Sequence, residues 1–153
     1  MAFKKELIST GNVWETDYPY NKGGRAPWTP ICKVHLDGAN LIFIAGQVPY
    51  DSRGRIWAPE SIRAQTELVM DNIKQVLGAA GAKASDIVHM RIYVVKEFMH
   101  DYVTKGARIY NKWFADNGVP EEELPPQTLL GVARLSQNDI VIEVEVTAVT
   151  KAG

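Results

Sequence analysis

The chain has 153 residues and a net charge of −1, and 46% of its residues are hydrophobic and 23% charged. This length favours one compact domain, and this composition excludes extensive disorder. A pI near 6.3 argues against nucleic acid as the main partner, because domains that grip a phosphate backbone are usually strongly basic.

Cysteine content and hydropathy indicate where the protein works. The single cysteine, Cys32, permits no internal disulfide, which fits a reducing compartment. No segment has the roughly 20 consecutive apolar residues of a membrane span. The N-terminal residues also lack the apolar run of a secretory signal. We therefore expect a soluble cytoplasmic protein with no membrane partner.

The first half of the chain predicts an arm, a hairpin and a helix. Residues 1–30 show neither a helical nor a strand period and end in a Gly- and Pro-rich stretch, which indicates an ordered arm. ICKVHL (31–36), the turn DGAN and the apolar run LIFIAG (41–46) predict a β-hairpin. Short extended pieces flank a turn at 51–54. Apolar residues at 3.6-residue spacing then predict a helix with Pro59 in its first turn and Gly81 just after its end.

The second half alternates strands and a helix. DIVHMRIYVV (86–95) predicts a strand with Val88, Met90, Ile92 and Val94 on one side and His89, Arg91, Tyr93 and Val95 on the other. A helical period from Phe98 to Asn117, which includes Val103, ends at an Asn-Gly stop signal. A proline-rich loop (119–126) precedes two strands, QTLLGVARL (127–135) and IVIEVEVTAV (140–149).

The predicted order is β-β-(β)-α-β-α-β-β. This order is typical of an α+β two-layer sandwich, in which a mixed sheet carries two helices on one face. Tyr93, Val95 and Val149 then lie on the opposite face, which is too apolar to face solvent alone. A partner subunit is the simplest cover, so we expect a homo-oligomer.

Common catalytic motifs do not identify a reaction. His35, His89 and His100 are not at metal-ligand spacing, and no Cys pair accompanies them, so we expect no metal site. The sequence contains no nucleophile elbow, P-loop or dinucleotide fingerprint. Cys32 lies in an alternating strand, where a small apolar strand residue is favoured over a nucleophile.

Six separated segments, however, resemble one family. They are PWTPICKVHLDGANLIFIAGQVPYDSRGRI, IRAQT with a downstream Asn72-Ile73, DIVHMRIYVV, IYNKWF, PPQTLLGVARL and IVIEVEVTAV. In this order and spacing they are similar to the YjgF/Rid family of small enamine/imine deaminases, with AGQVP, AQT and IEVEV the most specific. The resemblance begins at about Pro27, so we divide the chain into an N-terminal arm (1–26) and a single domain (27–153).

The resemblance implies a chorismate-mutase-like α+β fold that assembles as a homotrimer, with a small-molecule site in each cleft between subunits. It implies no metal and no organic cofactor. Family members hydrolyse reactive enamines and imines, such as 2-aminoacrylate, to a carbonyl compound and ammonia. Relatives have also been described as translation inhibitors with ribonuclease activity, which the acidic pI does not support.

The chain departs from the family pattern at four positions. In Pro125-Pro126-Gln127-Thr128, Gln127 stands where the deaminase branch has an Arg that clamps the substrate carboxylate. Gln can form hydrogen bonds with that group but contributes no charge. Trp28, Ala45 and Ala107 stand at the family's aromatic, Ser and Asn positions. These substitutions argue against the usual 2-aminoacrylate substrate.

Glu143 in IVIEVEV is at the position that resembles the family's acid, which exchanges protons with water and substrate. The alternative is that Glu143 and Glu145 only form a polar sheet face. The predicted substrate-binding residues are Trp28, Ala45, Gly46, Gln127, Thr128, Tyr93 and Arg91. Trp28 is either a stacking wall or an interface anchor. Ala45, Gly46 and Gln47 are candidate backbone donors, and Arg25, Arg91 and Arg134 are either replacement cations or surface residues.

Three functions follow as hypotheses. The first is a hydrolytic deaminase of an enamine or imine other than 2-aminoacrylate, for example a 2-aminomuconate-like compound. The second is a non-catalytic ligand-binding or chaperone-like trimer that has lost the clamp Arg. The third is an RNA-cleaving translation inhibitor, whose RNA binding would be sensitive to salt.

Overall fold

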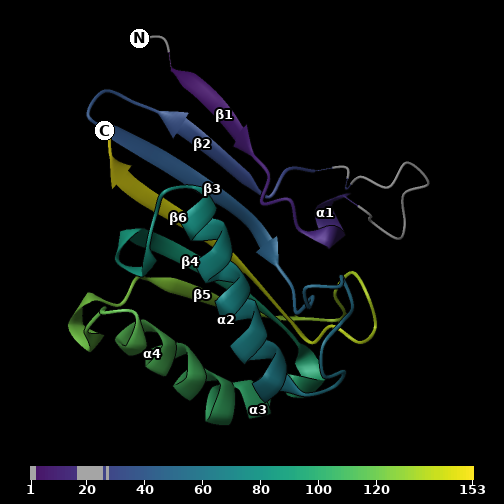
Figure 1. Ribbon diagram of the computed structural model, residues 1–153. Helices are drawn as coiled ribbons and strands as arrows, with labels where there is room; N and C mark the ends of the chain where they lie inside the picture. Colours follow the sequence, from purple (N-terminus) through teal and green to yellow (C-terminus); the bar gives the residue numbers. More distant parts are fainter. Residues whose placement is uncertain (1–2, 17–25, 27) are drawn as a thin grey trace.

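A computed structural model describes residues 3–16, 26 and 28–153. Its strands form a six-stranded sheet in the order β1-β2-β3-β6-β4-β5 (Figure 1). Their bounds are β1 (Lys4–Ile8), β2 (Ile31–His35), β3 (Ala39–Gln47), β4 (Ile87–Val95), β5 (Gln127–Val132) and β6 (Ile142–Lys151). β4 and β5 run parallel, whereas the other neighbouring strands are antiparallel, so the sheet is mixed as expected.

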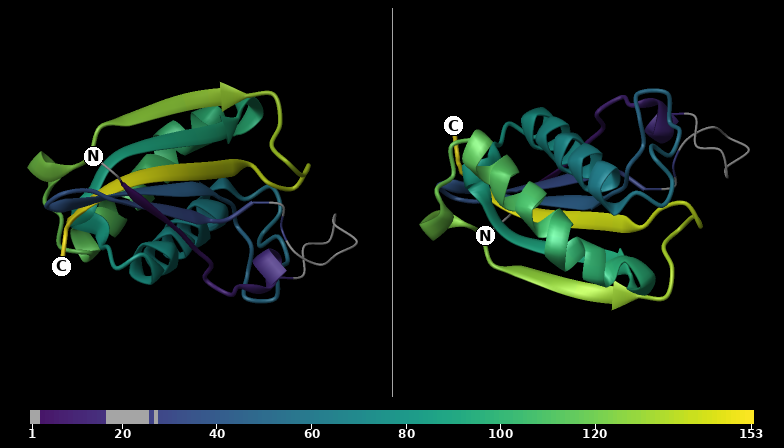
Figure 2. Two further views of the ribbon diagram at one scale, coloured as in Figure 1. Left: turned by 90° about the horizontal axis from the view of Figure 1, so that it is seen from above. Right: turned by 90° about the horizontal axis from the view of Figure 1, so that it is seen from below.

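Two long helices cover one face of this sheet. They are α2 (Ile62–Ala79) and α4 (Ala107–Asp116), with the short α3 (Met99–Asp101) leading toward α4. Figure 2 shows the helices gathered on the same side of the strands. The architecture is therefore the α+β two-layer sandwich that the element order predicted. In the part of the chain that the structure describes, no helix is long and apolar enough to cross a bilayer.

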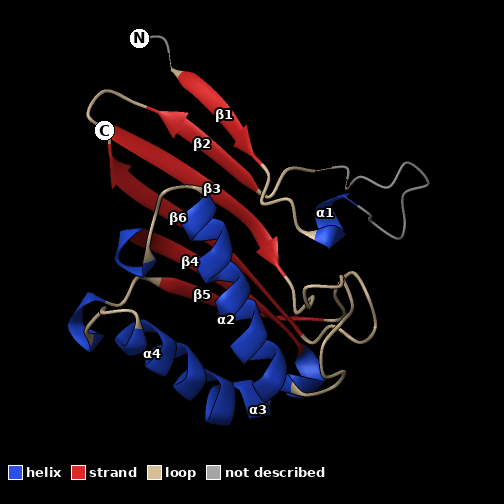
Figure 3. Cartoon of the chain, viewed as in Figure 1, coloured by secondary structure: helices blue, strands red, loops and turns tan. Residues whose placement is uncertain are grey.

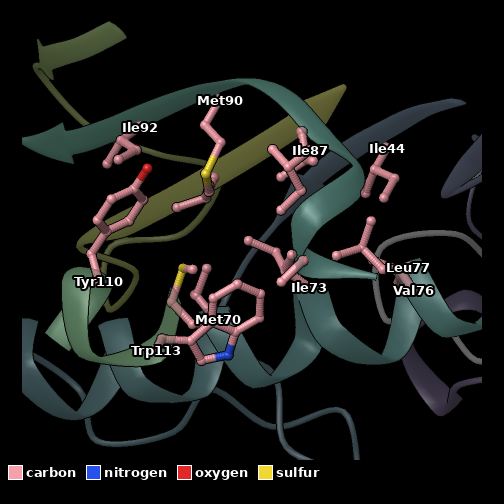
Figure 4. Close-up of a cluster of buried hydrophobic side chains, with 14 of the residues drawn as sticks. Ile44, Met70, Ile73, Val76, Leu77, Ile87, Met90, Ile92, Tyr110 and Trp113 are labelled. Carbon is pink, nitrogen blue, oxygen red and sulfur yellow. The ribbon is translucent and has the colours of Figure 1, made fainter. Parts of the chain in front are cut away.

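The core lies between the helices and the sheet. Side chains that alternate on the strands meet the apolar stripes of α2 and α4, as the two periods require. Figure 4 shows part of this cluster: Ile44, Ile87, Met90, Ile92, Met70, Ile73, Val76, Leu77, Tyr110 and Trp113. The rings of Tyr110 and Trp113 each meet Phe114 edge to face, with ring centroids 4.9 and 5.0 Å apart.

The N-terminal arm contains regular structure that the sequence pattern did not predict. β1 pairs antiparallel with β2 at the edge of the sheet, and the four-residue α1 (Val13–Thr16) follows it (Figure 3). Side chains of β1 are mostly exposed, so the strand carries no alternating signal. Glu15 is buried and accepts hydrogen bonds from the hydroxyl groups of Ser9 and Thr10, which ties α1 to the end of β1.

The first long helix ends where predicted but starts later. Pro59 was expected in its first turn, and this expectation is wrong: the helix begins at Ile62, and the Ser61 hydroxyl accepts the Ala64 N–H as an N-cap. At the other end Gly81 has φ +72°. Its N–H donates to the Gly78 carbonyl, and the Ala82 N–H donates to the Leu77 carbonyl, which is the Schellman arrangement.

A β-bulge changes which residues of β4 face the core. Val88 was expected on the core side, but it is 43% exposed, whereas Ile87 is buried. The pairing of β4 with β6 shifts register between Ile87 and His89. An extra residue at this point turns Val88 outward. Beyond it, Met90, Ile92 and Val94 are buried as predicted.

The second helical segment also departs from a regular 3.6-residue period. A π-helical turn, Tyr102–Gly106, separates α3 from α4. Val103 was predicted on the buried face but is 56% exposed, because it lies within this wider turn, where the 3.6-residue period does not hold. Gly106 permits this turn, since a Cβ there would lie 2.5 Å from the Tyr102 ring. Asn117-Gly118 ends α4 as expected, with φ +78° at Gly118.

Two further extended segments are shorter than expected. The strand predicted over 127–135 ends at Val132, where the chain turns away from the edge of the sheet. The short extended pieces expected on both sides of the turn at 51–54 form only a single bridge, between Tyr50 and Ile56. Both segments become loops that lie near the start of β6.

The two glycines at the end of α2 predict opposite effects of one substitution. Gly81→Ala should lower the free energy of unfolding by about 1–2 kcal/mol, because an alanine is disfavoured at φ +72°. Gly78→Ala should raise it by about 0.5–1 kcal/mol, because a Cβ there meets open space inside a helix. Urea denaturation of both variants tests this pair, and equal effects would contradict it.

Candidate active site

A cavity of about 270 Å³ lies beyond the end of β3, beside the start of β6. Trp28, Ala45, Gly46, Gln47, Val48, Tyr50, Ser136 and Glu143 line it. Four of the residues predicted for the site, Trp28, Ala45, Gly46 and Glu143, therefore meet in one place although they are far apart in the sequence.

A break in the sheet creates the position of the acid. The pairing of β3 with β6 shifts register between Ile44 and Gln47, so Ala45 and Gly46 form a bulge opposite β6. A Cβ at Gly46 would lie 1.9 Å from the Glu143 Oε1. Residue 46 must therefore be glycine for the carboxyl group to occupy this place.

The Glu143 carboxyl group is half-buried, and its environment favours the protonated form. Burial raises the pKa of Glu143 above its ordinary value of 4.5, and the nearby charge of Glu145 raises the pKa further. A carboxyl group that holds its proton closer to neutral pH can both donate and accept a proton. This property suits acid–base chemistry better than a purely polar surface role.

Glu145 is held by two predicted substrate-binding residues. Arg91 Nη1 donates to Glu145 Oε1, and the Tyr93 hydroxyl donates to Glu145 Oε2 at 3.1 Å. Tyr93 lies directly opposite Glu143 in the pairing of β4 with β6. Arg91 does not line the cavity, and its cationic group is engaged by Glu145. Tyr93 thus lies beside Glu143 and Arg91 beside Glu145, and neither is among the residues that line the cavity.

Gln127 and Thr128 lie elsewhere in the single chain. They begin β5 at the exposed edge of the sheet, where Gln127 pairs with Met90 and Thr128 with Arg91. Glu143 is level with Tyr93, three residues further along the strand from Met90, which is about 10 Å. One chain therefore brings together only part of the predicted site. Ala107, at the start of α4, also does not line the cavity.

Tyr50, Val48 and Ser136 complete the cavity, and sequence reasoning did not select them. Tyr50 and Ser136 lie in loops with turn composition, which gave no sign of a site. The Gln137 Nε2 donates to the Tyr50 hydroxyl and so joins these loops across the rim. Trp28 is 43% exposed and offers a flat wall.

The remaining candidates contribute less to the cavity. Ala45 is not a free backbone donor, because its N–H donates to the Pro30 carbonyl. Arg134 is exposed outside the lining, and Arg25 lies outside the described residues. Cys32 is a half-buried residue of β2, opposite Phe43. Among the residues that the structure describes, the lining contains no Lys, Arg or His.

Metal-binding side chains are not clustered in residues 3–16, 26 and 28–153. No group of three or more His, Cys, Asp or Glu side chains there could hold a metal ion. His35 instead forms hydrogen bonds with Asn40 and Glu6.

Comparison with known families gives an assignment that agrees with this geometry. The family described as Endoribonuclease L-PSP matches residues 26–150. The chain belongs to this family, the YjgF/Rid family. The match includes the elements that form the cavity and also β5.

Two curated relatives match this YjgF/Rid chain over nearly its whole length. A 2-iminobutanoate/2-iminopropanoate deaminase of Escherichia coli is 32% identical over 147 residues, covering 95% of this chain and 98% of the relative. A RutC family protein of Pyrococcus horikoshii is 31% identical, covering 94% of this chain and 97% of the relative. The family thus includes proteins named as imine deaminases.

Solved structures show the same fold. E. coli TdcF with bound serine superposes with a TM-score of 0.71 at 24% identity, covering 95% of this chain and 98% of TdcF. The YjgF gene product of E. coli gives a TM-score of 0.66 at 27% identity, covering 90% of this chain and 97% of that protein. These matches support the α+β sandwich of the YjgF/Rid chain.

The raised pKa of Glu143 predicts a pH-dependent cost of folding. The pKa of Glu143 in the folded state lies above the ordinary value of 4.5. Below about pH 4.5 Glu143 therefore does not lower the free energy of unfolding, and this free energy falls as the pH rises from there through the raised pKa. Glu143→Gln stays neutral and should therefore be more stable than the wild type at about pH 8, but not at about pH 4. Urea denaturation at both pH values measures this difference.

Glu122→Gln, which changes an exposed glutamate in the short 3₁₀ helix Glu121–Glu123, is the matched control. Its stability should follow the wild type at both pH values. A Glu143→Gln variant with the same pH dependence as the wild type would contradict the buried-acid interpretation.

Proposed function

We propose that this chain is a cofactor-independent hydrolytic deaminase, which converts a reactive enamine or imine to a carbonyl compound and ammonia. The observation that carries the proposal is the half-buried Glu143 carboxyl group with a raised pKa, at the wall of a cavity open enough for a small molecule. The relative named 2-iminobutanoate/2-iminopropanoate deaminase, 32% identical to this chain, supports the same reaction class.

Glu143 can carry both proton transfers of C=N hydrolysis. The protonated carboxyl group donates to the imine nitrogen, and the resulting carboxylate accepts a proton from water as the oxygen attacks carbon. The carbinolamine then receives that proton on nitrogen, the C–N bond breaks, and ammonia leaves. The Glu143 carboxylate accepts the hydroxyl proton as the carbonyl forms, which restores the protonated acid, and one water is consumed for each ammonia. An enamine enters this sequence after a proton reaches its carbon.

The substrate we propose is conjugated and differs from 2-aminoacrylate, with a 2-aminomuconate-like compound as the example. Trp28 and Tyr50 provide aromatic surface on which a flat conjugated group can stack. No cationic side chain lines the described cavity, so a small 2-imino acid lacks its usual ionic clamp. Gln127 offers hydrogen bonds without charge to a larger substrate that reaches it.

We further propose a homotrimer in which each site lies between subunits. The face of the sheet away from the helices carries exposed apolar residues on four of its strands: Leu7 on β1, Phe43 on β3, Val149 on β6 and Leu130 on β5. Such a surface is typical of a subunit contact. A neighbouring subunit would cover it and could bring its Gln127 and Thr128 to the cavity that holds Glu143.

The family description also names an endoribonuclease, which makes RNA cleavage the second candidate. The described cavity lining favours the deaminase, because it offers an acid and aromatic walls but no cation for a phosphate. We also propose a cytoplasmic location, which the single cysteine supports because it permits no internal disulfide.

A substrate panel tests the activity. Ammonia release should be measured with 2-aminoacrylate generated in situ, a branched 2-imino acid and 2-aminomuconate. We expect turnover of the conjugated compound, and a loss of about 100-fold or more in kcat for Glu143→Gln, because both proton transfers then lack their carrier. Gln127→Arg should gain activity on 2-aminoacrylate by restoring a carboxylate clamp.

Glu122→Gln is again the control and should keep wild-type rates. Rates equal to buffer across the panel from a folded protein would contradict the deaminase. Salt-sensitive RNA cleavage in the same preparations would favour the second candidate.

Subunit assembly is tested by light scattering on a size-exclusion column. The wild type should have three times the chain mass of 17.0 kDa. Phe43→Glu and Leu130→Glu should shift it toward the monomer, because each places a charge on the uncovered apolar face. Trp57→Glu, which changes an exposed aromatic in a loop away from that face, should leave the trimer intact. A monomeric wild type would contradict the proposal.

A further inference from the structure

Helix α2 carries two amide side chains that face the loops around the cavity. Gln65 is completely buried and Asn72 is half-buried, and seven residues separate them, so both lie on the same side of the helix. They belong to the AQT and Asn72-Ile73 segments. Neither residue lines the cavity, so direct contact with a substrate there does not explain them.

Gln65 holds the segment that leads into β6. Its Nε2 donates to the Asp139 carbonyl at 2.6 Å, and its Oε1 accepts the Val141 N–H at 2.9 Å. Glu143 follows Val141 by two residues. The same Nε2 lies 3.3 Å from the Ala58 carbonyl, in a loop where Ala58 has φ +45°. Gln65 therefore ties α2 both to the strand entry beside the acid and to a strained loop.

Asn72 holds another part of the wall. Its Nδ2 donates to the Val48 carbonyl at 3.0 Å and to the Tyr50 carbonyl at 3.1 Å. Val48 and Tyr50 line the cavity together with Glu143. One side chain thus fixes the backbone on both sides of Pro49.

Gln65 and Asn72 hold two different segments of the cavity wall, and both project from the same helix, α2. An apolar side chain at either position would leave backbone polar groups in the interior without partners, which favours movement of the loops toward water. The Gln137–Tyr50 hydrogen bond joins these loops at the rim, so movement of one would be transmitted to the other.

We propose that Gln65 and Asn72 are positioning residues that set the width of the cavity and hold Glu143 in its half-buried place. The kinetic consequence of this proposal rests on the deaminase function. The effect on the environment of Glu143 does not, because it follows from geometry alone.

The experiment compares Gln65→Met and Asn72→Leu with Ile73→Val. Met and Leu keep approximate size but remove the amide. Ile73 lies on the same helix, is buried in the core and does not line the cavity, so Ile73→Val lowers stability without changing an amide. Each variant is measured for kcat and KM on the panel compound that the wild type turns over, and for thermal unfolding.

The second readout needs no activity. The Glu143 carboxyl carbon is followed by NMR during a pH titration of ¹³C-glutamate-labelled protein, and its signal is assigned by its loss in Glu143→Gln. The charged and titratable groups beside it, Glu145 on β6 and Arg91 and Tyr93 on β4, are unchanged in every variant. A change in titration therefore reports water access and position.

We expect kcat to fall about tenfold or more in both amide variants with a smaller change in KM, because misplacement of a reacting group mainly affects the chemical step. The pKa of Glu143 should fall toward its ordinary value as water enters, since burial is the main cause that raises it. Ile73→Val should keep both wild-type values even where its thermal stability matches that of the amide variants.

Amide variants that fold and retain the wild-type Glu143 titration would overturn the proposal, whatever their rates. If one amide variant does not fold, the Glu143 titration of the other variant decides whether the proposal stands. If the wild type turns over no panel compound, the deaminase fails, yet a lowered Glu143 pKa in Gln65→Met or Asn72→Leu would still support the positioning role.

Discussion

The close approach of the Glu143 carboxyl group to the backbone of Gly46 is the constraint on which the site depends. It requires a bulge in β3 opposite Glu145 of β6, a glycine in that bulge, and a Glu143 side chain that reaches Gly46 from two residues along β6. Burial against this backbone raises the pKa of the acid. The walls of the cavity then follow from the loops that leave β3 and enter β6. The pairing of β3 with β6 therefore sets both the position of the Glu143 carboxyl group and its raised pKa.

The sheet performs different tasks on its two faces. Alternate residues of β3, β4 and β6 pack under α2 and α4 and supply the core. The residues between them form the opposite face, where an acid, an ion pair and exposed apolar side chains lie together. Figure 2 shows no described element covering that face. Because side chains alternate along each strand, a register change that improved one face would disrupt the other.

Two features around the Glu143 carboxyl group and the entry to α2 lower the stability of the folded chain. The acid is kept where ionisation is unfavourable, and Ala58 and Glu60 adopt positive φ in the loop that leads into α2. The amides of Gln65 and Asn72 on α2 offset part of this cost by satisfying backbone groups in the loops. A rigid helix is well suited to this task, since its core-facing residues fix its position against the sheet.

The sequence alone determined the layers of the fold and the C-terminal ends of both long helices, and it selected four of the residues that meet at the cavity: Trp28, Ala45, Gly46 and Glu143. These depend on local signals: a 3.6- or 2-residue period, Gly81 and Gly118 at positive φ, and family segments that keep their spacing. Only the tertiary structure decided the β4 bulge, the π-helical turn and the pairing of the exposed β1. Sheet register and packing determine these features, and they depart from the 2- or 3.6-residue period of the local sequence. It also decided that Tyr50 and Ser136 join the cavity whereas Gln127 does not within one chain. Such contacts join residues far apart in sequence, and no periodicity encodes them.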